Sequence, residues 1–106
     1  MAQRKILYSP QFGAGWTSWE SDPEIKTLML TYAPIIDALE RGERVTKDHP
    51  AIAQLQADVT ALGKDMPYLG GLRDIAIATV NGPVRIQEYD GSESIETQND
   101  AQEGWL

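Results

Sequence analysis

The sequence contains no cysteine and a single histidine, His49. The lack of cysteine excludes disulfide bonds, thiolate metal sites and cysteine nucleophiles, and it is compatible with a reducing compartment. No apolar run approaches the roughly 18 residues that a membrane-spanning helix needs. Residues 1–8 are basic at the start but lack the apolar stretch of a signal peptide. We therefore expect a cytoplasmic protein with no membrane contact.

Basic residues are also scarce. Nine lysines and arginines stand against 16 aspartates and glutamates, which gives a net charge of −7. A nucleic-acid backbone is bound by a basic face, so direct nucleic-acid binding is not expected. No basic residue follows Arg85, whereas six acids do: Glu88, Asp90, Glu93, Glu96, Asp100 and Glu103. Such an acidic end is typical of a solvated, self-repelling surface, and it also suits nucleic-acid mimicry or docking onto a basic partner.

Apolar residues at helical spacing predict a first helix that begins at Asp22-Pro23 and ends at Gly42. Pro34 lies inside this stripe and cannot donate a hydrogen bond to the carbonyl of Leu30, so the helix either kinks there or divides into two. Because the apolar stripe continues without a phase break, we expect a kink.

A second helix is predicted to begin near Asp48-His49-Pro50, with His49 as a solvent-facing cap residue, and to end at Gly63. Short β-prone or alternating runs predict strands. They cover residues 5–9, 73–80, 84–89 and, as a short last strand, 94–97. The tight turn at residues 81–83 predicts that the second and third of these strands form a hairpin.

The predicted order is β-α-α-β-β-(β). Two amphipathic helices each need one face covered, and a small, mostly antiparallel sheet of three or four strands can cover them. We therefore expect a two-layer α+β sandwich, with residues 1–97 as one domain and residues 98–106 as a polar, loose tail. The first strand should join the C-terminal hairpin, which places the loop after Ser9 beside one end of that hairpin.

Catalytic signatures are missing from the sequence. A nucleophilic triad needs a base, and the one histidine is accounted for as a helix cap. There is no cluster of histidines and no calcium-binding loop pattern. Glu88 and Asp90 share a strand face and would suit acid–base work or a metal, although solvated acids at a strand end are the commoner explanation. We predict no catalytic residue, no metal ligand and no cofactor.

A glycine–tryptophan loop follows the first strand, and it is the first candidate ligand site. It lacks the third glycine of a dinucleotide fingerprint and the lysine of a P-loop. Its small residues would let backbone amides approach a ligand, and its indoles would offer a stacking surface. The alternative is that the tryptophans plug a small core. The candidate residues from this part of the chain are Tyr8, Gly13, Ala14, Gly15, Trp16, Ser18 and Trp19.

Two further turns complete the candidate site. Arg73 follows a double glycine and would clamp a phosphate or carboxylate, or else pair with Asp74, Glu88 or Asp90 to hold the turns together. The second turn combines an aromatic ring, acids and a hydroxyl. The candidates from these turns are Arg73, Asp74, Glu88, Tyr89, Asp90 and Ser92.

Three segments carry a resemblance to a known group: YSPQFGAGWTSW at 8–19, GGLRD at 70–74 and EYDGSE at 88–93. With them, the chain resembles a widespread group of small uncharacterised proteins of bacteriophages and prophages over nearly its whole length. The resemblance implies a phage protein made inside an infected bacterium, and small phage proteins of this size often antagonise host defence.

Two functional hypotheses follow from the residues and the resemblance together. The first is a non-enzymatic, homo-oligomeric binder that sequesters a small, nucleotide-derived signalling ligand through tryptophan stacking and Arg73. The second is an inhibitor that binds a host defence protein through the acidic C-terminal third of the chain.

Overall fold

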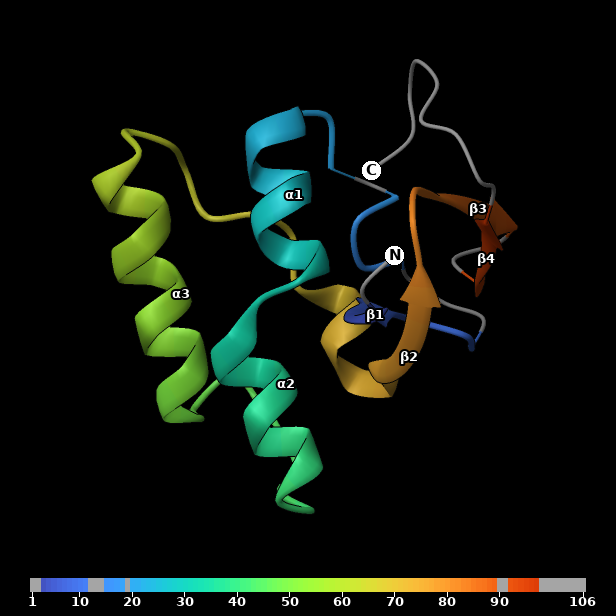
Figure 1. The fold of residues 1–106 in the computed structure, drawn as a ribbon. Coiled ribbons are helices and arrows are strands. Elements are labelled where there is room, and N and C mark those ends of the chain that lie inside the picture. Colours follow the sequence, from blue (N-terminus) through green and yellow to red (C-terminus); the bar gives the residue numbers. More distant parts are fainter. Residues whose placement is uncertain (1–2, 12–14, 19, 90–91, 98–106) are drawn as a thin grey trace.

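The computed structural model describes residues 3–11, 15–18, 20–89 and 92–97 (Figure 1). Its elements, in chain order, are β1 (Gln3–Tyr8), α1 (Pro23–Leu30), α2 (Ala33–Glu40), α3 (Pro50–Ala61), the 3₁₀ helix η1 (Gly70–Asp74), β2 (Ala76–Asn81), β3 (Val84–Tyr89) and β4 (Ser92–Thr97). The α+β class is therefore confirmed. The predicted tail, 98–106, lies outside the described residues. No helix in the described ranges has the length and apolar character to cross a membrane.

The predicted first helix is divided rather than kinked. Asp22 caps α1 as expected, because its carboxylate accepts hydrogen bonds from the backbone N–H groups of Glu24 and Ile25. The helix then ends at Leu30, and Pro34 lies in the first turn of α2, where a helix needs no N–H donor. The expectation of a kink is wrong, since a break between two helices accommodates the proline without leaving the Leu30 carbonyl facing its ring.

The start of α3 agrees with the sequence. His49 is the N-cap, and its Nδ1 accepts a hydrogen bond from the Ala51 N–H at 3.0 Å. Nε2 therefore carries the ring proton of the neutral form and donates to the Glu43 carboxylate, 2.7 Å away. The expectation that His49 faces solvent is wrong: its side chain is only 15% exposed, because its ring nitrogens are used by Ala51 of its own helix and by Glu43.

The strands form two antiparallel pairs instead of one sheet. β1 pairs with β2, from Gln3 opposite Asn81 to Tyr8 opposite Ala76. β3 pairs with β4, from Val84 opposite Thr97 to Tyr89 opposite Ser92. The predicted hairpin between residues 73–80 and 84–89 is therefore wrong.

The chain changes sheets where that hairpin was expected. Gly82 takes a left-handed conformation, with φ of 75°, and Pro83 has no N–H to donate to a ladder with β2. Val84 is then fully buried against Ile6, Leu30 and Val80. Burial of this side chain directs β3 away from the edge of β2.

The helices lie together on one side of the molecule and the strands on the other (Figure 1). Helix α1 contacts β1, α2 contacts both β1 and β2, and α3 packs on α2. Neighbouring residues of a strand point to opposite faces, and both faces of β1 are covered by buried side chains. Leu7 belongs to the large cluster under the helices, whereas Ile6 belongs to the smaller cluster with Val84. The strand thus separates two cores.

Candidate functional site

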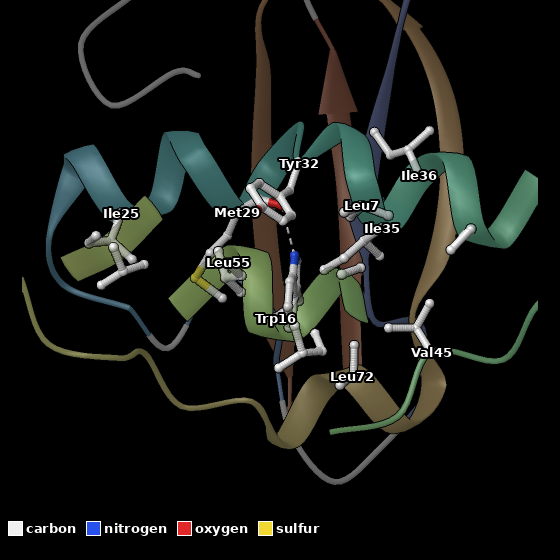
Figure 2. Packing of buried hydrophobic residues seen from close by; sticks show 14 residues of the cluster. Leu7, Trp16, Ile25, Met29, Tyr32, Ile35, Ile36, Val45, Leu55 and Leu72 are labelled. Atoms are coloured by element: carbon white, nitrogen blue, oxygen red, sulfur yellow. Dashed lines mark hydrogen bonds between the residues drawn. The ribbon is translucent and has the colours of Figure 1, made fainter. Parts of the chain in front are cut away.

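Trp16 is a core residue. Only 1% of it is exposed, and its indole Nε1 donates a hydrogen bond to the Met29 carbonyl at 3.0 Å. Figure 2 shows the ring in the middle of the large cluster, between α1 and Leu72 of η1. Its ring faces are used in packing, so for Trp16 the core alternative applies and no stacking surface is offered to a ligand. Trp19 lies outside the described residues.

A buried carboxylate organises the backbone of the same loop. Glu93 is 3% exposed and accepts four hydrogen bonds. Oε1 accepts from the Ser9 N–H at 2.8 Å. Oε2 accepts from the N–H groups of Trp16 at 2.7 Å and Ser18 at 3.0 Å, and from the Ser18 hydroxyl at 2.6 Å. We call these donors, from Ser9, Trp16 and Ser18, the amide cradle. The nearby Thr17 hydroxyl is fully buried and finds no partner among the described residues.

The double glycine of η1 approaches the loop from the other side. A Cβ added to Gly71 would lie 2.5 Å from the Gly15 carbonyl oxygen and 2.8 Å from the Trp16 nitrogen. Such distances leave room only for glycine. The structure thus brings the three suspected segments into contact, but they meet through tightly packed backbone and a buried acid rather than around an open pocket.

The other candidate residues are dispersed. Tyr8 is half-buried in β1, and the Ser92 hydroxyl donates to the Pro10 carbonyl at 2.8 Å. Glu88 and Tyr89 are exposed on β3, and Asp74 is the last residue of η1. The remaining loop candidates, Gly13, Ala14 and Asp90, lie outside the described residues.

Arg73 is exposed and lines a groove that sequence reasoning missed. The groove has a volume of about 320 Å³ and lies between η1 and the connection from α2 to α3. We call it the cationic groove. Its lining residues are Arg44, Val45, Thr46, Lys47, Leu69, Gly70, Leu72 and Arg73. Buried Val45 and Leu72 make its floor apolar, and no acid is among the described residues that line it.

The cations of this groove have no partners in the described part of the chain. Elsewhere, lysine and arginine side chains are engaged: Lys5 with Glu40, Arg41 with Glu43, Lys64 with Asp22, Arg85 with Glu96, and Arg4 with the Gly82 carbonyl. That leaves four basic side chains without a hydrogen bond or ion pair to a described residue: Lys26, Arg44, Lys47 and Arg73. Three of the four line the same groove. In a protein of net charge −7, this is a concentration of unneutralised positive charge.

An exposed aromatic ring borders the groove. Tyr68 is 61% exposed, and its ring lies so close to Gly70 that a Cβ there would come within 2.5 Å of the ring atoms. Gly70 itself lines the groove. An aromatic ring therefore lies next to a residue that lines the groove with the three cations.

Shifted pKa values mark ion pairs at helix ends. Hydrogen bonds from Arg41 and His49 lower the pKa of Glu43 to about 2, and a hydrogen bond from Lys64 lowers the pKa of Asp22. Both carboxylates stand next to a helix boundary and connect it to another segment. The hydrogen bonds that lower the pKa values of Glu43 and Asp22 therefore have a structural role.

Comparisons with protein-family models, with curated proteins and with solved structures find no match to this chain. Functional reasoning therefore depends on the geometry. Part of the groove's signal was present in the sequence, because Arg44 and Lys47 place two cations within four residues of an acidic chain. Their meeting with Arg73 depends on η1 returning over that segment.

Proposed function

We propose that this protein is a non-enzymatic binder of a small anionic ligand, of the nucleotide-derived class, held in the cationic groove. The observation that carries the proposal is the gathering of Arg44, Lys47 and Arg73, three cations with no partner among the described residues, around one hollow with an apolar floor. Like charges repel one another, and this chain has an excess of acidic residues that could have paired with these cations. That the three side chains have no partner among the described residues supports a role of their charge in binding.

The groove has the chemistry of a phosphate site. Arginine guanidinium groups bind phosphate oxygens bidentately, and lysine adds a mobile point charge. Gly70 has no side chain to block the approach of a ligand to the backbone. A volume of about 320 Å³ lies at the lower end of small-molecule sites. The net negative charge of the chain repels anions at long range, but salt screens that repulsion beyond about 10 Å.

Tyr68 would recognise the base. Stacking a base on an aromatic ring contributes about 1–3 kcal/mol, and Tyr68, next to Gly70 of the groove, is 61% exposed. Tyr68 thereby takes the role that the sequence had assigned to Trp16, while Arg73 keeps its own.

The biological setting is part of the same proposal. The resemblance to phage proteins suggests sequestration of a nucleotide signal in the cytoplasm of an infected bacterium. A second copy of the chain over the open side of the groove would enclose the ligand, which fits the expected homo-oligomer.

The hypothesis of a protein-interaction inhibitor has less support from the same structure. Of the acids it relies on, Glu93 is buried in the amide cradle and Glu96 pairs with Arg85 at 2.9 Å. Asp100 and Glu103 lie outside the described residues.

The test measures, by thermal shift and calorimetry, the binding of a panel of mononucleotides, cyclic nucleotides, pyrophosphate and inorganic phosphate. A ligand at 100 times its dissociation constant stabilises the fold by about 2.7 kcal/mol. Arg73→Ala and Arg44→Ala should each weaken binding roughly 10-fold or more, since hydrogen bonds to charged groups contribute about 1.5–3 kcal/mol.

Lys26→Ala is the matched control, because Lys26 also lacks a described partner but lies on α1, outside the groove. An equal loss in Lys26→Ala would show that only overall charge matters. If no anion of the panel stabilises the protein, the proposal is wrong.

A further inference from the structure

The amide cradle has the features of a ligand site that is already filled. Three backbone N–H groups and one hydroxyl converge on a single carboxylate at 2.6–3.0 Å. The donors belong to residues 75–84 positions away from Glu93 in the chain. No cation of the described residues forms an ion pair with this acid, so backbone dipoles provide its stabilisation. Convergent N–H groups of this kind bind anions in many proteins.

The cradle is held in place without help from Glu93. On the core side, the Trp16 indole donates to the Met29 carbonyl. Gly71 packs against the Gly15 carbonyl, and the Glu20 N–H donates to the Thr17 carbonyl at 3.0 Å. Because these contacts fix the loop from its other sides, its N–H groups should still converge when the acid is removed.

Glu93 also connects two parts of the fold. It lies at the start of β4, and its own N–H donates to the Ser9 carbonyl at 2.7 Å. The Ser92 hydroxyl donates to the next carbonyl, that of Pro10. Together with the carboxylate, these bonds attach the β3–β4 hairpin to the end of β1.

We infer that the amide cradle is a carboxylate-binding site, that the chain fills it with Glu93, and that it binds a free small carboxylate once that side chain is gone. Docking of the β3–β4 hairpin is then an intramolecular binding event, with Glu93 as the ligand. The inference does not depend on the cationic groove.

Glu93→Ala tests this directly, since the substitution removes the Cγ methylene and the carboxylate, and acetate replaces both with its methyl and carboxylate groups. Loss of the carboxylate leaves buried N–H donors unpaired and should lower the melting temperature by roughly 10 °C or more. Acetate should then restore stability along a saturating curve. At ten times its dissociation constant it would raise the folding equilibrium constant of the variant about 11-fold.

The controls separate site binding from a salt effect. Sodium chloride at equal ionic strength should not restore the variant, and neither should trimethylacetate, which is too bulky for the space. The wild-type protein should not respond to acetate, because its site is full. Glu96→Ala, on the same strand but with its side chain 40% exposed, should be neither strongly destabilised nor rescued.

A second variant keeps the test decisive if Glu93→Ala does not fold alone. Glu93→Gln keeps the shape but turns an NH₂ group toward N–H donors, so it should be destabilised and should not respond to acetate. A Glu93→Gln protein as stable as the wild type would overturn the inference. So would a Glu93→Ala protein that acetate and chloride affect equally, or one that stays unfolded at saturating acetate.

Discussion

Gly71 is the position where one added methyl group tests how closely η1 packs on the glycine–tryptophan loop. In Gly71→Ala, the new Cβ would lie 2.5 Å from the Gly15 carbonyl oxygen and 2.7 Å from its carbon. These are backbone atoms of a loop held by Trp16 and Glu93, so they cannot rotate away as the end of a side chain would. Relief therefore requires η1 and the loop to separate by several tenths of an ångström.

The cost of that separation follows from overpacking. Forcing an extra methyl group into a well-packed region costs about 1–3 kcal/mol. A smaller opposing gain of about 0.4–1 kcal/mol comes from the reduced freedom of the unfolded chain. The net loss for Gly71→Ala should therefore be about 1–2 kcal/mol, or a melting temperature lower by roughly 4–15 °C.

Gly70→Ala is the matched comparison one residue earlier. Its Cβ would meet the Tyr68 ring, which is the end of an exposed side chain and can move. Stability should change by less than about 0.5 kcal/mol, while ligand binding in the cationic groove should weaken because the ring is displaced. Urea unfolding followed by circular dichroism measures both variants. If Gly71→Ala is as stable as Gly70→Ala, the loop and η1 do not pack as described.

Two further perturbations test contacts between helices. Tyr32→Phe removes a part-buried hydroxyl that donates to the Asp58 carboxylate at 2.6 Å; burial first, and then this hydrogen bond, raise the pKa of Tyr32. Unfolding in urea should show a loss of about 1–2 kcal/mol, and a loss below about 0.3 kcal/mol would mean that the bond between α3 and the start of α2 adds nothing. Glu43 has a folded pKa of about 2 against an ordinary 4.5, so its contribution is full above pH 4.5 and declines as the pH falls toward 2. Melting temperatures of Glu43→Gln should therefore vary less with pH across this window than those of the wild type, and an identical acid profile would refute the assignment.

The helix boundaries could be predicted because their signals are local. Asp22 and His49 cap helices with side chains that reach only two or three residues ahead. Gly42 and Gly63 end helices with φ of 80° and 72°, a conformation that glycine adopts without strain. Each of these helix starts and ends depends on residues within a few positions of it, so it can be predicted from a single sequence.

Strand pairing could not be read in the same way. The turn at residues 81–83 has the composition of a hairpin, yet β2 pairs with β1, whose residues lie more than 65 positions earlier. What decides the pairing is the burial of Val84 in the cluster with Ile6 and Leu30, a contact between distant segments. The residues of the turn suit both a hairpin of β2 with β3 and the observed change from one strand pair to the other.

The candidate site shows the same division between local and distant information. Glu93 looks like its acidic neighbours Glu88 and Glu96, and nothing in its local pattern marks it as buried. Its burial depends on donors from a loop that only the folded chain brings within 3.0 Å. Likewise, Arg73 could be singled out after a double glycine, but Arg44 and Lys47 become its partners only through the path of η1.

The two glycines of η1 join these features into one arrangement. Gly71 packs on the loop that Glu93 stabilises, and Gly70, its neighbour, lines the cationic groove. Any movement of the loop therefore reaches the wall of the groove through a single peptide unit. Glu93 satisfies the buried N–H donors of that loop, so its hydrogen bonds add to the contacts that already hold the loop against η1.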